Sequence, residues 1–313
     1  MERIFTIDYH CSFDNTLQKA KCFVAAGSEK RPLLVGLHTW SGDYEQDCTS
    51  YAAYCLEHNW NFIYPDFRGP NWTPIACGSD AVVSDIADAV SYMKRAALVD
   101  EDRIYLIGGS GGGHASLLMA GRHPELWTAV SAWCPISDVS AWHDECVING
   151  EGYDKHIRLA CGGEPSKDES VKADALYRSP VTYMQNASRC LVDINAGIHD
   201  GHTGSVPVSQ TLNAFNLLAA PEEQISEEDV QFITENEQIP AHLGKPQEDP
   251  AFGTDHPVLF RRRSNLARVT IFEGGHDCVA AAALDWLSRQ NRKKAPDWMP
   301  GKAADIKVGE LAR

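Results

Sequence analysis

Short apolar runs alternate with amphipathic stretches along most of the chain. Apolar runs of strand length lie at residues 2–8, 19–26, 33–40, 61–67, 103–109, 127–134, 189–197 and 268–273. Between them, apolar residues recur at helical spacing: Val82, Ile86, Val90, Met93 and Ala97 follow the suitable N-cap Ser79, and a second helix is predicted over 207–220. Strands that alternate with helices predict an α/β fold with a mainly parallel, eight-stranded sheet covered by helices on both faces.

A glycine-rich turn follows the run at 103–109 and contains Ser110. The segment 108–112 reads GGSGG, which matches the GxSxG pattern of a nucleophile elbow between a strand and a helix. Glycines two positions either side of the serine remove side chains that would clash in so sharp a turn. A phosphate-binding loop would need a Lys and a Ser or Thr where His114 and Ala115 stand. The turn therefore favours Ser110 as a nucleophile.

An acid and a base follow Ser110 in the chain order that this kind of site requires. Asp200 stands in the loop after the apolar run at 189–197, and His276 stands in the loop after the run at 268–273. A serine, an acid and a histidine in that order are expected at the carboxyl ends of neighbouring parallel strands. We therefore predict a catalytic triad of Ser110, Asp200 and His276, in which His276 accepts the proton of Ser110 and Asp200 orients the imidazole.

Two other acids and a histidine cluster compete with this assignment. Asp193 lies within a predicted strand and Asp277 directly follows His276, so Asp277 is the better alternative to Asp200 as the acid. The group formed by His199, Asp200 and His202 superficially suggests a metal site. No further ligand stands at a typical spacing, so we expect neither a metal nor an organic cofactor.

Several motifs together resemble one superfamily. They are YPDFRG at 64–69, SPV at 179–181, GIHDGHTGSVPVSQ at 197–210 and EGGHD at 273–277. Over about residues 30–290 the chain resembles the α/β-hydrolase superfamily and, within it, the catalytic domain of the prolyl oligopeptidase family and related esterases. The resemblance implies the α/β-hydrolase fold and the triad named above.

The chain departs from that family at two points. The family's oxyanion strand commonly ends in HGG, whereas here Thr39 and Trp40 follow His38. We expect the oxyanion hole to use the backbone N–H groups of Gly111 and Trp40, with Thr39 as the alternative to Trp40. The family's oligopeptidases carry a large β-propeller, for which these 313 residues have no room, and this weakens a peptidase assignment.

Two long segments interrupt the alternation of strands and helices within what we expect to be a single domain over 1–313. Residues 137–184 are predicted to form a cap-like insertion, and residues 221–263 a second insertion before the histidine strand. In the first insertion, the candidates to face the site are Trp142, His143, Tyr153 and His156. Tryptophans at a pocket mouth would suit stacking on a sugar or an aromatic acyl group. The candidate substrate-binding residues are Thr39, Trp72, Trp142 and His202.

The composition excludes several classes of partner. With 28 basic and 43 acidic residues the net charge is −15, which argues against nucleic acid or an anionic membrane as a partner. The basic run 261–263 reads as a solvated loop patch. The first residues are no signal peptide, so we expect a cytoplasmic protein, or a secreted or periplasmic one whose signal has been removed. Ten cysteines without a CxxC motif favour free, buried thiols.

These observations predict a serine hydrolase that cleaves carboxylic esters through an acyl-enzyme. Its expected substrate is a small molecule or an oligosaccharide ester, such as an acetylated sugar. An exopeptidase or amidase that uses the same triad is the first alternative. A non-catalytic binding protein with a hydrolase fold would require a broken triad, and Ser110, Asp200 and His276 form an intact one. The sequence is compatible with a homo-oligomer as well as with a monomer.

Overall fold

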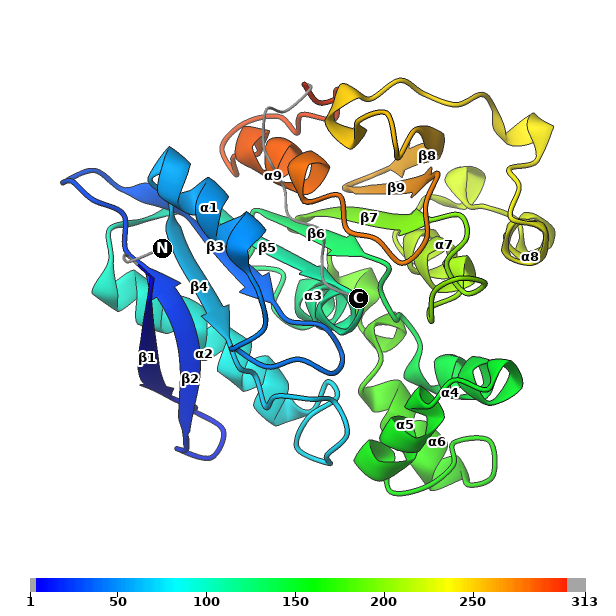
Figure 1. The fold of residues 1–313 in the computed structure, drawn as a ribbon, viewed down its shortest axis with the longest axis horizontal. Helices are drawn as coiled ribbons and strands as arrows, with labels where there is room; N and C mark the ends of the chain where they lie inside the picture. Colours follow the sequence, from blue (N-terminus) through cyan, green and yellow to red (C-terminus); the bar gives the residue numbers. More distant parts are fainter. Residues whose placement is uncertain (1–3, 303–313) are drawn as a thin grey trace.

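The computed structural model describes residues 4–302, in which one twisted sheet lies between two layers of helices (Figure 1). The sheet has nine strands in the order β1-β2-β4-β3-β5-β6-β7-β9-β8. Their bounds are β1 Phe5–His10, β2 Leu17–Phe23, β3 Arg31–Leu37, β4 Asn61–Pro65, β5 Val99–Gly109, β6 Ala129–Trp133, β7 Leu191–Gly197, β8 Val258–Ser264 and β9 Ala267–Phe272. This is the α/β architecture that the apolar pattern predicts.

The six central strands, which are β4, β3, β5, β6, β7 and β9 in sheet order, run parallel to one another. The flanking strands β2 and β8 are antiparallel to their neighbours. All residues of β4, β6, β7 and β9 are buried, as expected for strands that helices cover on both faces. Because the parallel strands share a direction, their carboxyl ends meet at one edge of the sheet. The loops after β3, β5, β6, β7 and β9 therefore converge there.

The ninth strand, β8, corrects the expected count of eight. It occupies the end of the predicted insertion 221–263, where three consecutive arginines conceal the alternation of a strand. Arg261 is not part of a solvated patch: its side chain is 6% exposed and pairs with Asp249 at 2.7 Å. Its guanidinium also lies over the ring of Phe252. Burial of the arginine against an acid and a ring explains why a basic run forms an edge strand.

The helices cover both faces of the sheet. They are α1 Thr49–His58, α2 Asp80–Ala96, α3 Gly111–Arg122, α4 Val139–Asn149, α5 Tyr153–Cys161, α6 Glu169–Tyr177, α7 Val208–Asn216, α8 Glu227–Asn236 and α9 Ala280–Arg289. Side chains of α1 and α9 pack in one apolar cluster, and those of α2, α3 and α7 pack in another on the opposite face. Ser79 caps α2 by accepting a hydrogen bond from the Val82 N–H, as predicted. The second predicted helix, α7, is shorter than expected and ends at Asn216.

Most of the predicted insertion 137–184 forms α4, α5 and α6, which Figure 1 shows at the lower right of the molecule. These helices share a small apolar core that includes Trp142 and Ile157, and Trp40 packs into the same core. Gln210 of α7 holds the start of the insertion, because its side-chain oxygen accepts the Ser137 N–H at 3.0 Å. Because Trp40 belongs to the loop after β3, its packing places the insertion beside that loop.

The ten cysteines all carry free thiols in the structure, and most of them are buried. None of the helices within residues 4–302 is long and apolar enough to cross a bilayer.

Candidate active site

Ser110 occupies the sharp turn between β5 and α3. Its backbone adopts φ 57° and ψ −120°, a conformation that a non-glycine residue rarely takes, and its N–H donates to the Trp133 carbonyl at 2.8 Å. Neighbouring glycines are required, since a Cβ on Gly108 would lie 2.3 Å from the Gly112 carbonyl oxygen. The strained turn places Ser110 above the carboxyl end of β5, as the predicted elbow requires.

The structure brings Asp200 and His276 into direct contact. The Nδ1 atom of His276 lies 2.9 Å from Oδ2 and 3.0 Å from Oδ1 of Asp200. The Asp200 carboxylate is fully buried and its Oδ1 also accepts the N–H groups of Gly201 and Val206, at 3.0 and 3.2 Å. These bonds fix the carboxylate that orients the imidazole.

The environment of His276 suits a general base. Burial lowers the pKa of His276, but the charge of Asp200 and the hydrogen bond to it outweigh burial, so the pKa is raised. With its Nδ1 proton directed at Asp200, the neutral ring leaves Nε2 free to accept a proton. Asp277, the alternative acid, instead accepts the Gly275 N–H at 2.9 Å. The geometry therefore favours Asp200 over Asp277.

Ser110 and His276 line one open cavity of about 830 Å³. Within residues 4–302, no hydrogen bond joins the Ser110 hydroxyl to His276, a contact that often tightens only when substrate binds. The other residues around the cavity come from the last positions of β5 and β6, from the loops after β3, β6, β7 and β9, and from α5: Thr39, Trp40, Ser41, Gly42, Gln46, Gly109, Trp133, Cys134, Tyr153, Thr203, Gly204, Ser205, Gly275, Asp277 and Cys278.

The two backbone groups predicted for the oxyanion hole lie together. A Cβ on Gly111 would come within 2.4 Å of both Cα and N of Trp40, so only glycine permits this approach. The Thr39 N–H donates to Gln46 Oε1 at 2.9 Å and is therefore already used. Gly111 and Trp40 remain the candidate donors.

His38, a residue outside the predicted site, packs beneath the Thr39–Trp40 backbone that forms this part of the cavity. Its ring is fully buried, stacks on Phe67 with centroids 3.8 Å apart, and contacts the carbonyl oxygens of Thr39 and Asp66 at 2.9 and 2.6 Å. Burial lowers the pKa of His38. In the sequence, the only indication of this role is that His38 directly precedes Thr39, a residue predicted for the site.

Most of the predicted substrate-binding side chains do not reach the cavity. Thr39 lines it, but Trp142 is 1% exposed, donates its indole N–H to the Ser205 carbonyl, and packs between Trp40 and Tyr153. Trp72 lies against His156 outside the cavity lining. From the insertion it is Tyr153 that lines the cavity.

The histidines near Asp200 have structural partners of their own. His202 contacts the Thr234 carbonyl at 2.7 Å and does not line the cavity. His199 bridges Glu237 and Glu273, both at 2.6 Å, and these two hydrogen bonds raise its pKa. His202 Nδ1 also lies 3.7 Å from the Glu237 carboxylate that His199 contacts, whereas the Asp200 carboxylate contacts His276.

Cys134 is a site residue that the sequence did not reveal. It follows β6 with φ 45°, is almost fully buried, and its Sγ lies 3.4 Å from the Asp277 carbonyl oxygen. Its thiol, the Asp200 carboxylate and the His276 ring offer ligand atoms that all lie within 4.8 Å of one another. Only the three-dimensional structure brings this thiol to the acid and the base.

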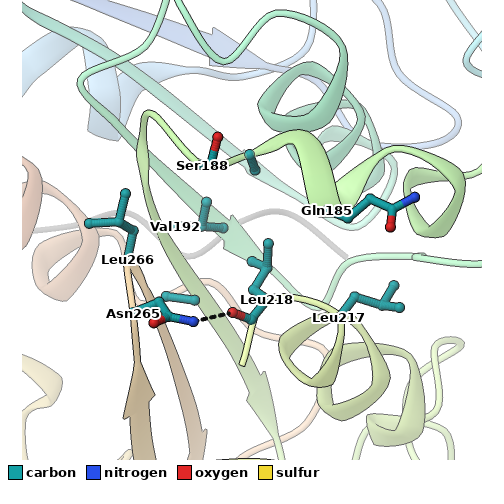
Figure 2. A pocket seen from close by; sticks show the side chains of 9 residues that line it. Gln185, Ser188, Val192, Leu217, Leu218, Asn265 and Leu266 are labelled. Carbon is teal, nitrogen blue, oxygen red and sulfur yellow. Dashed lines mark hydrogen bonds between the residues drawn. The ribbon is translucent and has the colours of Figure 1, made fainter. Parts of the chain in front are cut away.

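A second cavity, of about 290 Å³, lies at the opposite edge of the sheet, near the start of β7 and β9 (Figure 2). Its lining is mainly aliphatic, with Val192, Leu217 and Leu218 among its residues, and Asn265 donates to the Leu218 carbonyl at 3.1 Å. None of the described lining residues is an acid, a base or a thiol. The hydroxyl of Ser188 therefore has no base beside it in this lining to activate it for nucleophilic chemistry.

Comparisons with known proteins agree with the fold and the motifs. A model of the prolyl oligopeptidase family matches residues 55–238, more than half of the chain. Acylamino-acid-releasing enzyme 1 of rice, Oryza sativa subsp. japonica, is 23% identical over a match of 184 residues, and this match covers 51% of this chain and 22% of that protein. The chain thus spans less than a quarter of the length of this relative.

Two solved structures have a similar fold. Acylaminoacyl peptidase of Pyrococcus horikoshii superposes with a TM-score of 0.64 at 14% identity, over 95% of this chain and 43% of that one. An acetyl xylan esterase from Paenibacillus sp. R4 superposes with a TM-score of 0.54 at 20% identity, over 71% and 76% of the two chains. The fold is that of the α/β hydrolases. The chain belongs to the prolyl oligopeptidase family.

Proposed function

We propose that the protein is a serine hydrolase that cleaves small, neutral carboxylic esters, acetylated sugars among them, through an acyl-enzyme. The hydrogen-bonded pair of Asp200 and His276, which shares one cavity with Ser110, is the observation that carries this proposal. Ser110 attacks the ester carbonyl while His276 Nε2 accepts its proton. The N–H groups of Gly111 and Trp40 bind the developing oxyanion, and His276 returns the proton to the leaving alcohol.

The preference for a neutral substrate follows from the cavity lining. Among the described residues that line the cavity, none is a lysine or an arginine, so a substrate carboxylate has no permanently charged cationic partner there. Asp277 is the sole carboxylate in this lining and it already accepts the Gly275 N–H, which disfavours selection of a free amino terminus. An uncharged acyl group and an uncharged leaving group suit such a lining best.

Hydrolysis of N-acylated peptides is the second candidate function. It is supported by family membership and by the likeness to proteins named acylaminoacyl peptidase and acylamino-acid-releasing enzyme. An acylated amino terminus carries no charge, so the same lining accommodates it. Similarity to the acetyl xylan esterase supports the ester reading instead.

A matched substrate panel tests the proposal. The compounds are p-nitrophenyl acetate, a peracetylated sugar, N-acetyl-alanine p-nitroanilide and alanine p-nitroanilide. We expect the esters to be hydrolysed fastest and the acetylated anilide to be cleaved faster than the free amine. Faster cleavage of the acetylated anilide than of both esters would establish the peptidase alternative, whereas a preference for the free amine would contradict a neutral site.

A further inference from the structure

The carboxyl ends of three adjacent strands bring a thiol, a carboxylate and an imidazole together. Cys134 follows β6, Asp200 follows β7 and His276 follows β9, and these strands are neighbours in the sheet. Their ligand atoms lie within 4.8 Å of one another. Sulfur, nitrogen and oxygen ligands of this kind are those that Zn²⁺ takes in proteins.

We propose that Cys134, Asp200 and His276 form a binding site for Zn²⁺ or a similar thiophilic divalent cation, and that occupancy of this site blocks catalysis. The metal site itself is independent of the proposed function, whereas the inhibition rests on it. Three protein ligands leave a fourth coordination position for water, which can enter because Cys134 and His276 both line the cavity.

The present geometry is close to that of a tetrahedral site. With Zn–S near 2.3 Å and Zn–N and Zn–O near 2.1 Å, tetrahedral ligand atoms lie about 3.4–3.6 Å apart. His276 Nδ1 and Asp200 Oδ2 are 2.9 Å apart and must separate slightly, while the Cys134 sulfur must approach the other two ligand atoms by at most about 1.2–1.4 Å.

The thiol is directed into this site by its backbone. Cys134 is held at φ 45°, and its N–H donates to the Asn195 carbonyl at 2.7 Å. The Sγ atom lies 3.4 Å from the Asp277 carbonyl oxygen and 3.9 Å from that of Gly275, and it also interacts with the Asp200 carboxylate, so coordination replaces the weak hydrogen bonds of a thiol. Burial and the negative charge of Asp200 raise the pKa of this thiol, and a bound cation reverses that effect.

A bound metal ion would inhibit hydrolysis by changing the protonation of His276, without filling the cavity. A Zn–S bond forms as the S–H bond of Cys134 breaks, and that proton leaves to solvent. A second bond forms to His276 Nδ1, whose proton moves to Nε2, so the imidazole stays neutral. Nε2 then carries a hydrogen and no longer accepts the proton of Ser110.

Titration with Zn²⁺ and Co²⁺ tests the site, in buffer without thiol reductants or chelators. Calorimetry with Zn²⁺ should show one ion bound per chain, and Co²⁺ should produce a thiolate-to-metal charge-transfer band. Both signals should be lost, or weakened at least about ten-fold in affinity, in Cys134→Ser and Cys134→Ala, since mutations of residues that merely support a metal ligand already cost that much. Cys278→Ser is the matched control, because Cys278 lines the same cavity but contacts Tyr51 at 3.6 Å instead of the acid and the base.

The outcomes separate the metal site from the proposed function. Zn²⁺ binding and inhibition that persist in Cys278→Ser and are lost in the Cys134 variants support the proposal. Binding that depends on Cys134 in a protein with no hydrolase activity would keep the site and overturn the proposed function. Equal Zn²⁺ affinity in the wild type and in both Cys134 variants would overturn the site.

Discussion

The Nδ1 atom of His276 lies 2.9 Å from Oδ2 of Asp200, although 76 residues separate them along the chain. β7 and β9 are adjacent and parallel, so the loops after them meet. Two backbone N–H groups hold the Asp200 carboxylate in place, and this carboxylate in turn fixes the orientation of the His276 imidazole.

Asp200→Asn should lower kcat by about three to four orders of magnitude, because an amide at this position stabilises the wrong tautomer of His276. The matched variant is Asp277→Asn, since Asp277 is the next residue after the histidine but bonds to the Gly275 N–H. Its effect on kcat should be much smaller. Steady-state kinetics on p-nitrophenyl acetate compare the two, and a larger loss in Asp277→Asn would reassign the acid.

The pH dependence of kcat/KM should reflect the raised pKa of His276. The neutral imidazole is the active form, so the rate should fall as the pH drops through a pKa above the ordinary value near 6.5. In Asp200→Asn the attraction of the carboxylate is lost and burial remains, which should move the inflection to lower pH. An inflection that stays in place in this variant would show that Asp200 does not set the pKa of the base.

Gly204→Ala should displace the side chains of Asp200 and His276 and so lower kcat. The added Cβ would lie 2.3 Å from Asp200 Oδ1 and 2.6 Å from the His276 Cβ, so both must shift. A displacement of about 1 Å at a catalytic group costs about 100-fold in rate. Gly152→Ala is the control, because its Cβ would meet no atom within 4 Å and its φ is −71°. Similar rates for the two variants would argue against a tightly fixed pair.

Arg68 provides a test of stability away from the site. Its guanidinium bonds Asp85 at 2.7 Å, and the Asp85 side chain is fully buried. Arg68→Met would leave that carboxylate buried without its cation and should lower the free energy of unfolding by about 3–5 kcal/mol. Lys19→Met, which removes the exposed pair with Asp8, should change it little. Denaturant unfolding compares them, and equal midpoints would contradict a structural role for Arg68.

The sequence predicts the parts of the site that follow from local pattern and chain order. The elbow at Ser110 has a glycine signature, and Asp200 and His276 each stand directly after a buried strand that the apolar runs identify. Parallel strands then place all three at one edge of the sheet. For these residues, local pattern and topology suffice.

Side-chain packing beyond that pattern could not be read from the sequence. Trp142 has the residue type expected at a pocket mouth, yet the core of the insertion buries it, and Tyr153 lines the cavity instead. β8 could not be predicted because its arginines have the composition of an exposed loop. Only the structure shows that Asp249, which an irregular loop brings near, neutralises the charge of the buried Arg261. Cys134 reaches the acid and the base through a positive φ that no local motif announces.

The most direct test of the proposed catalytic role of Ser110 is covalent labelling with a fluorophosphonate, read by intact-protein mass. The wild type should gain one label, and Ser110→Ala should gain none while keeping the same circular dichroism spectrum. Cys134→Ala, whose side chain faces the same cavity, should still be labelled and so controls for disturbance of the pocket. Equal labelling of the wild type and Ser110→Ala, or a wild type that is not labelled at all, would contradict an activated serine at this elbow.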